Sequence, residues 1–300
     1  MIWGKRLLSV VLVAGLATGC STVASTVASL PGVPASVKPA VDIAQKTGEK
    51  ALTAARPLSD SEEYYLGRGV AARILAQYPL SNNEALTAYV NKVGQTVARH
   101  ASGPQPYRGY HFAVLQGPTA NSFACPGGII LVTEGMLRAC ANEDQLAAVI
   151  AHEVGHVVHR DGVNSISQAR WTEVATTAGT EIAKQYGGTV GKLVAEFEGA
   201  IDDVFKTVIV NSYSRAAEEQ ADLAGVAMLQ KAGYNPAAMA AILEALRARG
   251  GRGGMLGTHP DIADRLRNLQ GVSQAANTEA EPARTKRFQS TVLAATRGRP

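Results

Sequence analysis

Apolar residues recur every three to four positions through most of the chain, which is typical of helices buried along one face. One such stripe, within residues 84–100, consists of Leu86, Tyr89, Val90, Val93 and Val97. Capping residues and Gly or Pro breaks delimit the segments, as at Ser59, Asn142 and Pro236. The pattern predicts helices over 59–78, 84–100, 142–160, 163–186, 189–229, 237–249 and 261–269.

Two short segments depart from the helical spacing and are typical of strands. Residues 110–115 alternate, and residues 129–133 are rich in β-formers after a tight bend at Gly127 and Gly128. Residues 121–126 are expected to be irregular. The chain is therefore expected to have a mostly helical α+β fold, with a small sheet just before the 142–160 helix.

Three stretches with different compositions indicate the domain organisation. Residues 20–57 are rich in Ser, Val, Ala and Pro and predict a tether. The helical pattern occupies residues 58–270, which predict one folded domain. Residues 271–300 are polar, and we expect a flexible C-terminal tail there.

Residues 1–19 resemble a bacterial lipoprotein signal peptide. Two basic residues precede an apolar run over 7–17 that is too short to cross a bilayer, and small residues lead to Cys20. Lipidation of Cys20 would anchor the chain to a membrane, and Ser21 resembles the signal for outer-membrane sorting. We expect an outer-membrane protein facing the periplasm; an ordinary secretory signal or an uncleaved anchor is the alternative.

The composition indicates a globular protein, and the charge gives no sign of nucleic-acid binding. The chain is 46% hydrophobic and 18% charged, as in globular proteins. Its formal charge of +4 is too small to indicate nucleic-acid binding.

In an oxidising envelope Cys125 and Cys140 could form a disulfide. Two buried thiols are the alternative, and the sequence cannot decide between them because it does not give their geometry.

The strongest chemical signal is the H-E-x-x-H motif formed by His152, Glu153 and His156. On a helix, residues four apart lie one turn above each other, so both imidazoles can bind one ion. Glu153 lies beside His152 and can reach a metal-bound water as its general base. Apolar neighbours would bury this helix and give the metal a dry, rigid wall.

A catalytic zinc needs a third protein ligand and an open position for water. A third His six residues after His156 is excluded, because Gly162 stands there. A Glu followed four residues later by an Asp is the other pattern, and two pairs match it: Glu198 with Asp202, and Glu218 with Asp222. Spacing alone does not choose between them.

The chain resembles the metallopeptidase family of HtpX, BepA and LoiP over most of its length. After the H-E-x-x-H motif, residues 214–222 match the family's Ser-Arg-x-x-Glu-x-x-Ala-Asp pattern. Residues 121–128 resemble its Asn-Ala-Phe-Ala-x-Pro-Gly-Gly segment, and further likeness covers 61–78, 232–236 and 258–260. The resemblance, closest to the soluble lipoprotein branch, implies a zincin-like domain with one Zn²⁺ per chain and Glu218 as the third ligand.

Further roles follow for residues around the metal. Asp222, one turn after Glu218, could accept a ring N–H from a ligand histidine and fix its tautomer. Arg215 could order Glu218 or pair with an acid, and a plain surface position is the alternative. The resemblance places His259 near the metal, where it would stabilise the oxyanion or close the open coordination position; a local cap before Pro260 is the alternative.

The strand at residues 129–133 could bind an extended substrate by β-augmentation through Ile129, Ile130, Leu131 and Val132. Such a mode would select flexible chains over folded ones. These features favour a zinc endopeptidase for unfolded or misassembled envelope proteins, working beside the envelope-protein assembly machinery. A non-catalytic assembly factor with a regulatory zinc, or a zinc hydrolase acting on another amide, is the alternative.

Overall fold

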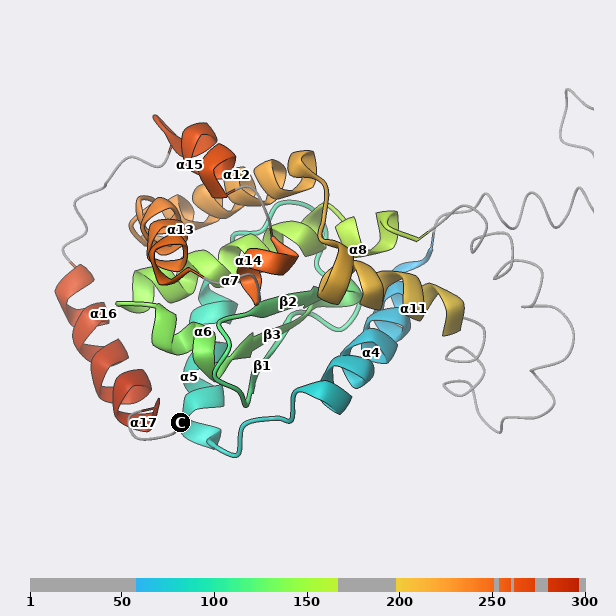
Figure 1. Cartoon of the computed structure of the whole chain (residues 1–300), viewed down its shortest axis with the longest axis horizontal. Coiled ribbons are helices and arrows are strands. Elements are labelled where there is room, and N and C mark those ends of the chain that lie inside the picture. The colour runs from blue at the N-terminus through green and yellow to red at the C-terminus, as the bar shows by residue number, and fades with distance from the viewer. Residues whose placement is uncertain (1–57, 167–197, 251–253, 260–261, 273–279, 297–300) are drawn as a thin grey trace, which may run out of the picture. The chain divides into compact units, whose positions relative to one another are not determined.

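The computed structural model describes residues 58–166, 198–250, 254–259, 262–272 and 280–296 (Figure 1). The predicted signal peptide, the lipidation site Cys20 and the tether lie outside the described residues, as does most of the predicted 163–186 helix. Within the described parts of the chain, no helix combines the length and apolar character that crossing a bilayer requires.

Helices account for most of these residues, and one small sheet accompanies them, so the predicted α+β class is confirmed. The longer helices are α4 (Asp60–Gln77), α5 (Glu84–Ala98), α7 (Glu143–Val158), α11 (Glu198–Lys206), α12 (Arg215–Ala232), α13 (Ala238–Arg249), α15 (Ile262–Leu269) and α16 (Glu281–Phe288). Shorter helical pieces are α6 (Glu134–Ala139), α8 (Asp161–Asn164), α14 (Met255–Thr258), α17 (Ala294–Thr296), the 3₁₀ turn η1 (Pro126–Gly128), and the π-helical turns η3 (Thr207–Asn211) and η4 (Gln289–Leu293).

The sheet contains β1 (His111–Leu115), β2 (Ser122–Cys125) and β3 (Ile129–Thr133) in the order β1-β3-β2. β3 runs parallel to β1 and antiparallel to β2. The sequence did not predict β2, because all four of its residues are buried and show no alternation of polar and apolar positions.

The prediction that residues 129–132 bind substrate by β-augmentation is wrong. β3 is the central strand, with β1 and β2 hydrogen-bonded to its two edges, so it has no free backbone edge for a third strand. Ile130, Leu131 and Val132 are buried, and Ile129 is half-buried. The β-formers revealed a strand but not its place in the sheet.

Helix α7, which carries the H-E-x-x-H motif, lies between α12 and the sheet (Figure 1). The Asn142 side chain caps it by accepting a hydrogen bond from the Gln145 amide, as its position in the sequence predicts. Leu146, Val149 and Ile150 are at most 1% exposed. Because α5, α12, α13 and α16 also pack against it, α7 is a rigid support for the side chains it carries.

The predicted continuous helix over 189–229 is interrupted. Helix α11 ends in the π-helical turn η3, and Ser212 then adopts φ 66° and ψ 160°, a conformation that non-glycine residues rarely occupy. Ser214 starts α12 with a side-chain cap. The apolar periodicity continues across this break, and therefore it did not reveal the two separate helices.

The prediction of a flexible C-terminal tail is wrong for residues 280–296. Helix α16 packs against α7, and Phe288 and Val292 are fully buried. Arg284 donates two hydrogen bonds to Asp144 at 2.9 and 2.8 Å, and Arg287 donates two to Glu143 at 2.8 and 2.6 Å. The acidic first turn of α7 is therefore paired with α16 rather than exposed to solvent.

The two cysteines within the folded region are buried free thiols, so of the two alternatives the structure favours thiols over a disulfide. Cys125 ends β2 and Cys140 follows α6. Burial raises the pKa of both thiols, to about 12 for Cys140. At neutral pH each is protonated and packs as a small apolar side chain.

Candidate metal centre

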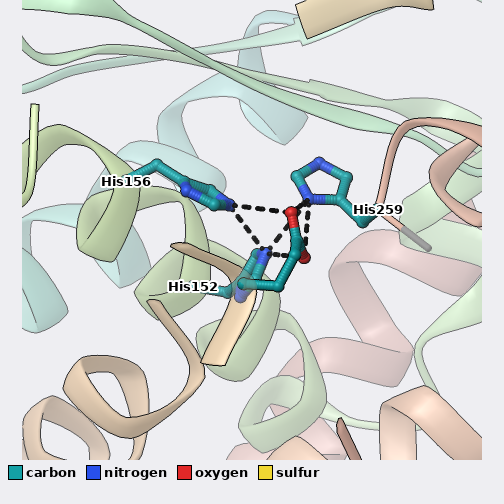
Figure 2. Close-up of side chains that lie close together, drawn as sticks. His152, His156 and His259 are labelled. Atoms are coloured by element: carbon teal, nitrogen blue, oxygen red, sulfur yellow. Dashed lines mark hydrogen bonds and ion pairs between the residues drawn. The ribbon is translucent and has the colours of Figure 1, made fainter. Parts of the chain in front are cut away.

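Four buried side chains that can ligate a metal converge on one point: His152, His156, Glu218 and His259 (Figure 2). The two Nε2 atoms of His152 and His156 lie 3.1 Å apart. Glu218 reaches them with Oε2 at 3.5 Å from His152 and Oε1 at 3.6 Å from His156. The cluster therefore joins α7, α12 and the segment after α14.

A close helix crossing brings these groups together. At Gly155 a side-chain Cβ would lie 2.8 Å from the carbonyl oxygen of Ala221, so only glycine allows α12 to approach α7 this closely. Ser214 begins α12 just before the crossing. Glu218 and Asp222, one turn apart on α12, consequently face the two histidines of α7.

The two α7 histidines each turn Nδ1 to a carboxylate and Nε2 to the centre of the cluster. His152 Nδ1 lies 2.8 Å from Asp222 Oδ1, and His156 Nδ1 lies 2.8 Å from Asp161 Oδ2. A carboxylate accepts the proton of each Nδ1, which leaves a lone pair on each Nε2. Two lone pairs 3.1 Å apart repel each other unless a cation lies between them. These donors therefore fit a metal ion.

Arg265 connects the carboxylates around the centre. It is 3% exposed, and its Nε and Nη2 donate to the two oxygens of Asp222 at 2.8 and 2.7 Å. Its Nη1 lies 3.1 Å from Glu218 Oε2. Burial alone would raise the pKa of Asp222, but Arg265 and His152 hold it well below its usual range. Asp222 therefore stays ionised and fixes the orientation of His152.

Two sets of residues considered from the sequence lie outside this cluster. Arg215 is three-quarters exposed and pairs with Asp264 at 3.3 Å, which are the alternatives of an acid partner and a surface position, while Arg265 contacts Glu218. Glu198 is exposed, and Asp202 pairs with Arg73 at 2.5 Å. Of the two Glu-x-x-x-Asp pairs, the structure brings only that of α12 to the histidines.

Glu153 lies beside the cluster but outside the four potential ligands. It is fully buried, Ser122 Oγ donates to its Oε1 at 2.7 Å, and its Oε2 has no hydrogen-bond partner among the described residues. The ring centroids of Tyr213 and His156 lie 4.4 Å apart, and the buried Tyr213 hydroxyl has no hydrogen-bond partner in the part of the chain that the structure describes. Unpaired buried polar atoms next to ligand-type side chains are typical of a site that accommodates water or substrate.

His259 is the fourth member of the cluster, and its backbone amide also caps the C-terminal end of α14 by donating to the Met255 carbonyl at 2.8 Å. Its Nδ1 lies 2.9 Å from Glu218 Oε1 and 3.2 Å from His152 Nε2. Burial alone would lower the pKa of His259, but the Glu218 carboxylate raises it. Thr258, which precedes it, donates to Asn121 Oδ1 at 3.2 Å and ties this segment to the start of β2. Pro260 lies outside the described residues.

The sequence profile of peptidase family M48 matches residues 84–273, which include the whole cluster. The chain belongs to peptidase family M48. The chain is 28% identical over 217 residues to the beta-barrel assembly-enhancing protease of Escherichia coli. The match covers 70% of this chain and 43% of that protein. It thus spans less than half the length of that relative.

Two further relatives of this M48 chain are metallopeptidases by name. The mitochondrial metalloendopeptidase OMA1 of Schizosaccharomyces pombe is 29% identical over 189 residues, covering 61% of this chain and 52% of that protein. The metalloprotease LoiP of Escherichia coli is 25% identical over 187 residues, covering 62% and 68%. Both likenesses agree with the metal-binding character of the cluster.

Three residues of this M48 site were not identified from the sequence: Ser122, Asp161 and Arg265. Asp161 reaches His156 because Arg160 adopts φ 57° and turns the chain back after α7. The spacing to His156 and the acidic side chain were the available signals. Ser122 lies in the family-like segment 121–128, but that resemblance implied no role for it; Arg265 is far from the motif in sequence, and its local pattern does not distinguish it from other polar residues.

Proposed function

We propose that this chain is a zinc-dependent endopeptidase. The observation that carries the proposal is the convergence of two imidazole Nε2 atoms and one carboxylate, with Glu153 beside them but not among the ligands. Two nitrogens about 2.0–2.1 Å from a tetrahedral zinc ion lie about 3.4 Å apart, and the donors of His152, His156 and Glu218 are separated by 3.1–3.6 Å.

The residues of the site have separate roles, as metal ligands or as groups that orient those ligands. His152, His156 and Glu218 would hold the ion, while Asp222 and Asp161 keep both rings in the ligating tautomer. Bound zinc supplies a Lewis acid for the scissile carbonyl and lowers the pKa of water toward about 7.

Glu153 acts as general base and then as general acid. Its carboxylate accepts a proton from the attacking water and returns it to the leaving nitrogen, so one water is added across the peptide bond. The buried surroundings strengthen these electrostatic interactions and exclude bulk water.

The proposed substrates are flexible polypeptides, in particular unfolded or misassembled envelope proteins. The name of the beta-barrel assembly-enhancing protease supports this choice, and so do the buried ligands, because a folded surface could not enter the site. We further propose that Cys20 carries a lipid that anchors the chain to the outer membrane on its periplasmic side.

Chelation of the metal provides the direct test of the proposed function. The purified full chain is expected to degrade reduced, unfolded casein, to lose that activity in 1,10-phenanthroline, and to regain it when zinc is restored. The measurement is the initial rate of fluorophore release from labelled casein. If the rate of casein cleavage is the same with and without 1,10-phenanthroline, the proposal is contradicted.

The position of His259 favours a resting form of the enzyme in which the zinc site is closed and inactive. His259 already lies among the ligands and would occupy the coordination position that water needs. A closed four-ligand site is also what a non-catalytic assembly factor would use. We propose that this residue closes the site reversibly.

Replacement of His259 by Ala is expected to raise the rate of casein cleavage. About a tenfold rise corresponds to a resting enzyme in which about one molecule in ten is open. The rate should be measured with the same zinc content in both proteins. A fall in rate would instead assign His259 to stabilisation of the oxyanion, and no cleavage by either protein would favour the assembly factor.

A further inference from the structure

Ser122 contacts the general base from the sheet side. Its Oγ donates a hydrogen bond of 2.7 Å to Glu153 Oε1, and both residues are fully buried. The other carboxylate oxygen of Glu153, Oε2, has no hydrogen-bond partner in the described part of the chain. The two oxygens of the base therefore differ: the protein anchors one and leaves the other as an open acceptor.

The backbone around Ser122 is held by several hydrogen bonds, so the position of its Cβ relative to Glu153 is fixed. Ser122 pairs with Val132 in the sheet, and its amide donates to Asn121 Oδ1 at 3.0 Å. The Asn121 amide in turn donates to Thr133 Oγ1 at 2.9 Å. A side chain on such a support loses little additional entropy when it orients a partner.

A glutamate on a helix has three side-chain torsions, and proton transfer needs its carboxylate within hydrogen-bond reach of the water. Glu153 projects from α7, and in the described residues Ser122 is its sole hydrogen-bond donor. His259 is the other near group, with Nε2 at 3.8 Å from Oε1. Ser122 is therefore the group that sets the orientation of this carboxylate.

We propose that Ser122 is a positioning residue for the general base: it anchors Glu153 Oε1 so that Oε2 remains free to accept the proton of the attacking water. The inference rests on the proposed peptidase function, which it deepens. It assigns a reaction role to strand β2, the strand that the sequence did not reveal, and it makes no use of the ligands themselves.

Ser122→Ala tests the inference, with Ser81→Ala as its matched control. Ser81 also donates to a carboxylate, Glu134 Oε1, at 2.7 Å, but lies outside the metal cluster. Ser122→Ala is expected to lower kcat about 10- to 100-fold relative to the parent. If only His259→Ala cleaves casein, Ser122→Ala is added to that variant and compared with it. KM should change less than about twofold and zinc content should stay the same, because Ser122 touches no ligand. Ser81→Ala should leave kcat unchanged.

A second readout uses the metal-free protein and no activity. Ser122→Ala should lower its Tm by about 4–8 °C, since a buried carboxylate loses a charge-assisted hydrogen bond. In a Glu153→Ala background the same change should lower Tm by clearly less, because no carboxylate remains. A fall in kcat without this coupling would overturn the inference.

The remaining outcomes separate the two proposals. If the parent cleaves casein and Ser122→Ala cleaves it equally fast or faster, the positioning role is overturned and the peptidase function stands. If neither the parent nor His259→Ala cleaves casein with zinc bound, the proposed function fails and the role of Ser122 fails with it.

Discussion

Replacement of Glu153 by Gln is expected to abolish casein cleavage while the protein keeps its zinc. Gln has the same shape and can still accept the Ser122 hydrogen bond, but it cannot take a proton from water. Because Glu153 is not one of the four potential ligands, the metal site should remain intact. General base catalysis contributes about 10²- to 10⁴-fold, so we expect kcat to fall by about a thousandfold.

The matched control is Glu219→Gln, which makes the same chemical change at an exposed residue of α12 next to Glu218. That variant should cleave casein at the parent rate. The two initial rates and the zinc content of each protein are the measurements. Undiminished cleavage by Glu153→Gln would show that another group is the base, and loss of zinc from it would show that Glu153 is a ligand.

The second large effect concerns stability: Arg284→Ala is expected to destabilise the folded domain by about 3–5 kcal/mol, the usual cost of leaving a buried charge without its partner. The Arg284 and Asp144 side chains are 8% and 2% exposed and share two hydrogen bonds. After the change Asp144 would keep the Asn235 amide at 2.8 Å but no cation from the described part of the chain. Urea unfolding followed by circular dichroism measures the difference.

Arg287→Ala is the control for that prediction, because it removes a similar two-fold contact from the same helix. Arg287 is half exposed, and Glu143 would keep the hydroxyls of Tyr89 and Tyr234. Its loss should cost less, about 1 kcal/mol, because the Arg287 end of the pair is already in contact with water and the buried Glu143 keeps two hydrogen-bond donors. Equal destabilisation by the two variants would mean that burial does not govern the strength of these contacts.

The sequence predicted the elements whose signals are local. The cap at Asn142, the acidic first turn and the apolar positions of α7 all lie within one helix, and the two histidines one turn apart need no tertiary information. The choice of Glu218 over Glu198 could not be made from a local signal, because both have the same spacing to an Asp. The family resemblance favoured Glu218, and the closeness of α12 to α7 then placed it beside the histidines.

The features that the sequence did not reveal depend on contacts between distant segments. Phe288 at the end of α16 and Val292 in η4 are the fully buried apolar residues of this segment, and two Arg–carboxylate pairs attach α16 to α7, so its sequence is as polar as that of a loose tail. Arg265 reaches Asp222 from a separate short helix. Polar residues in such roles look like surface residues until the fold brings their partners to them.

The zinc content of the purified chain tests the central claim most directly, because every proposed role depends on one ion held by α7 and α12. Mass spectrometry of the metal should give one zinc per chain for the parent. Separate substitution of His152, His156 or Glu218 by Ala should remove it, while Arg215→Ala should retain it. A parent without bound metal, or full zinc occupancy in all three ligand variants, would contradict the account.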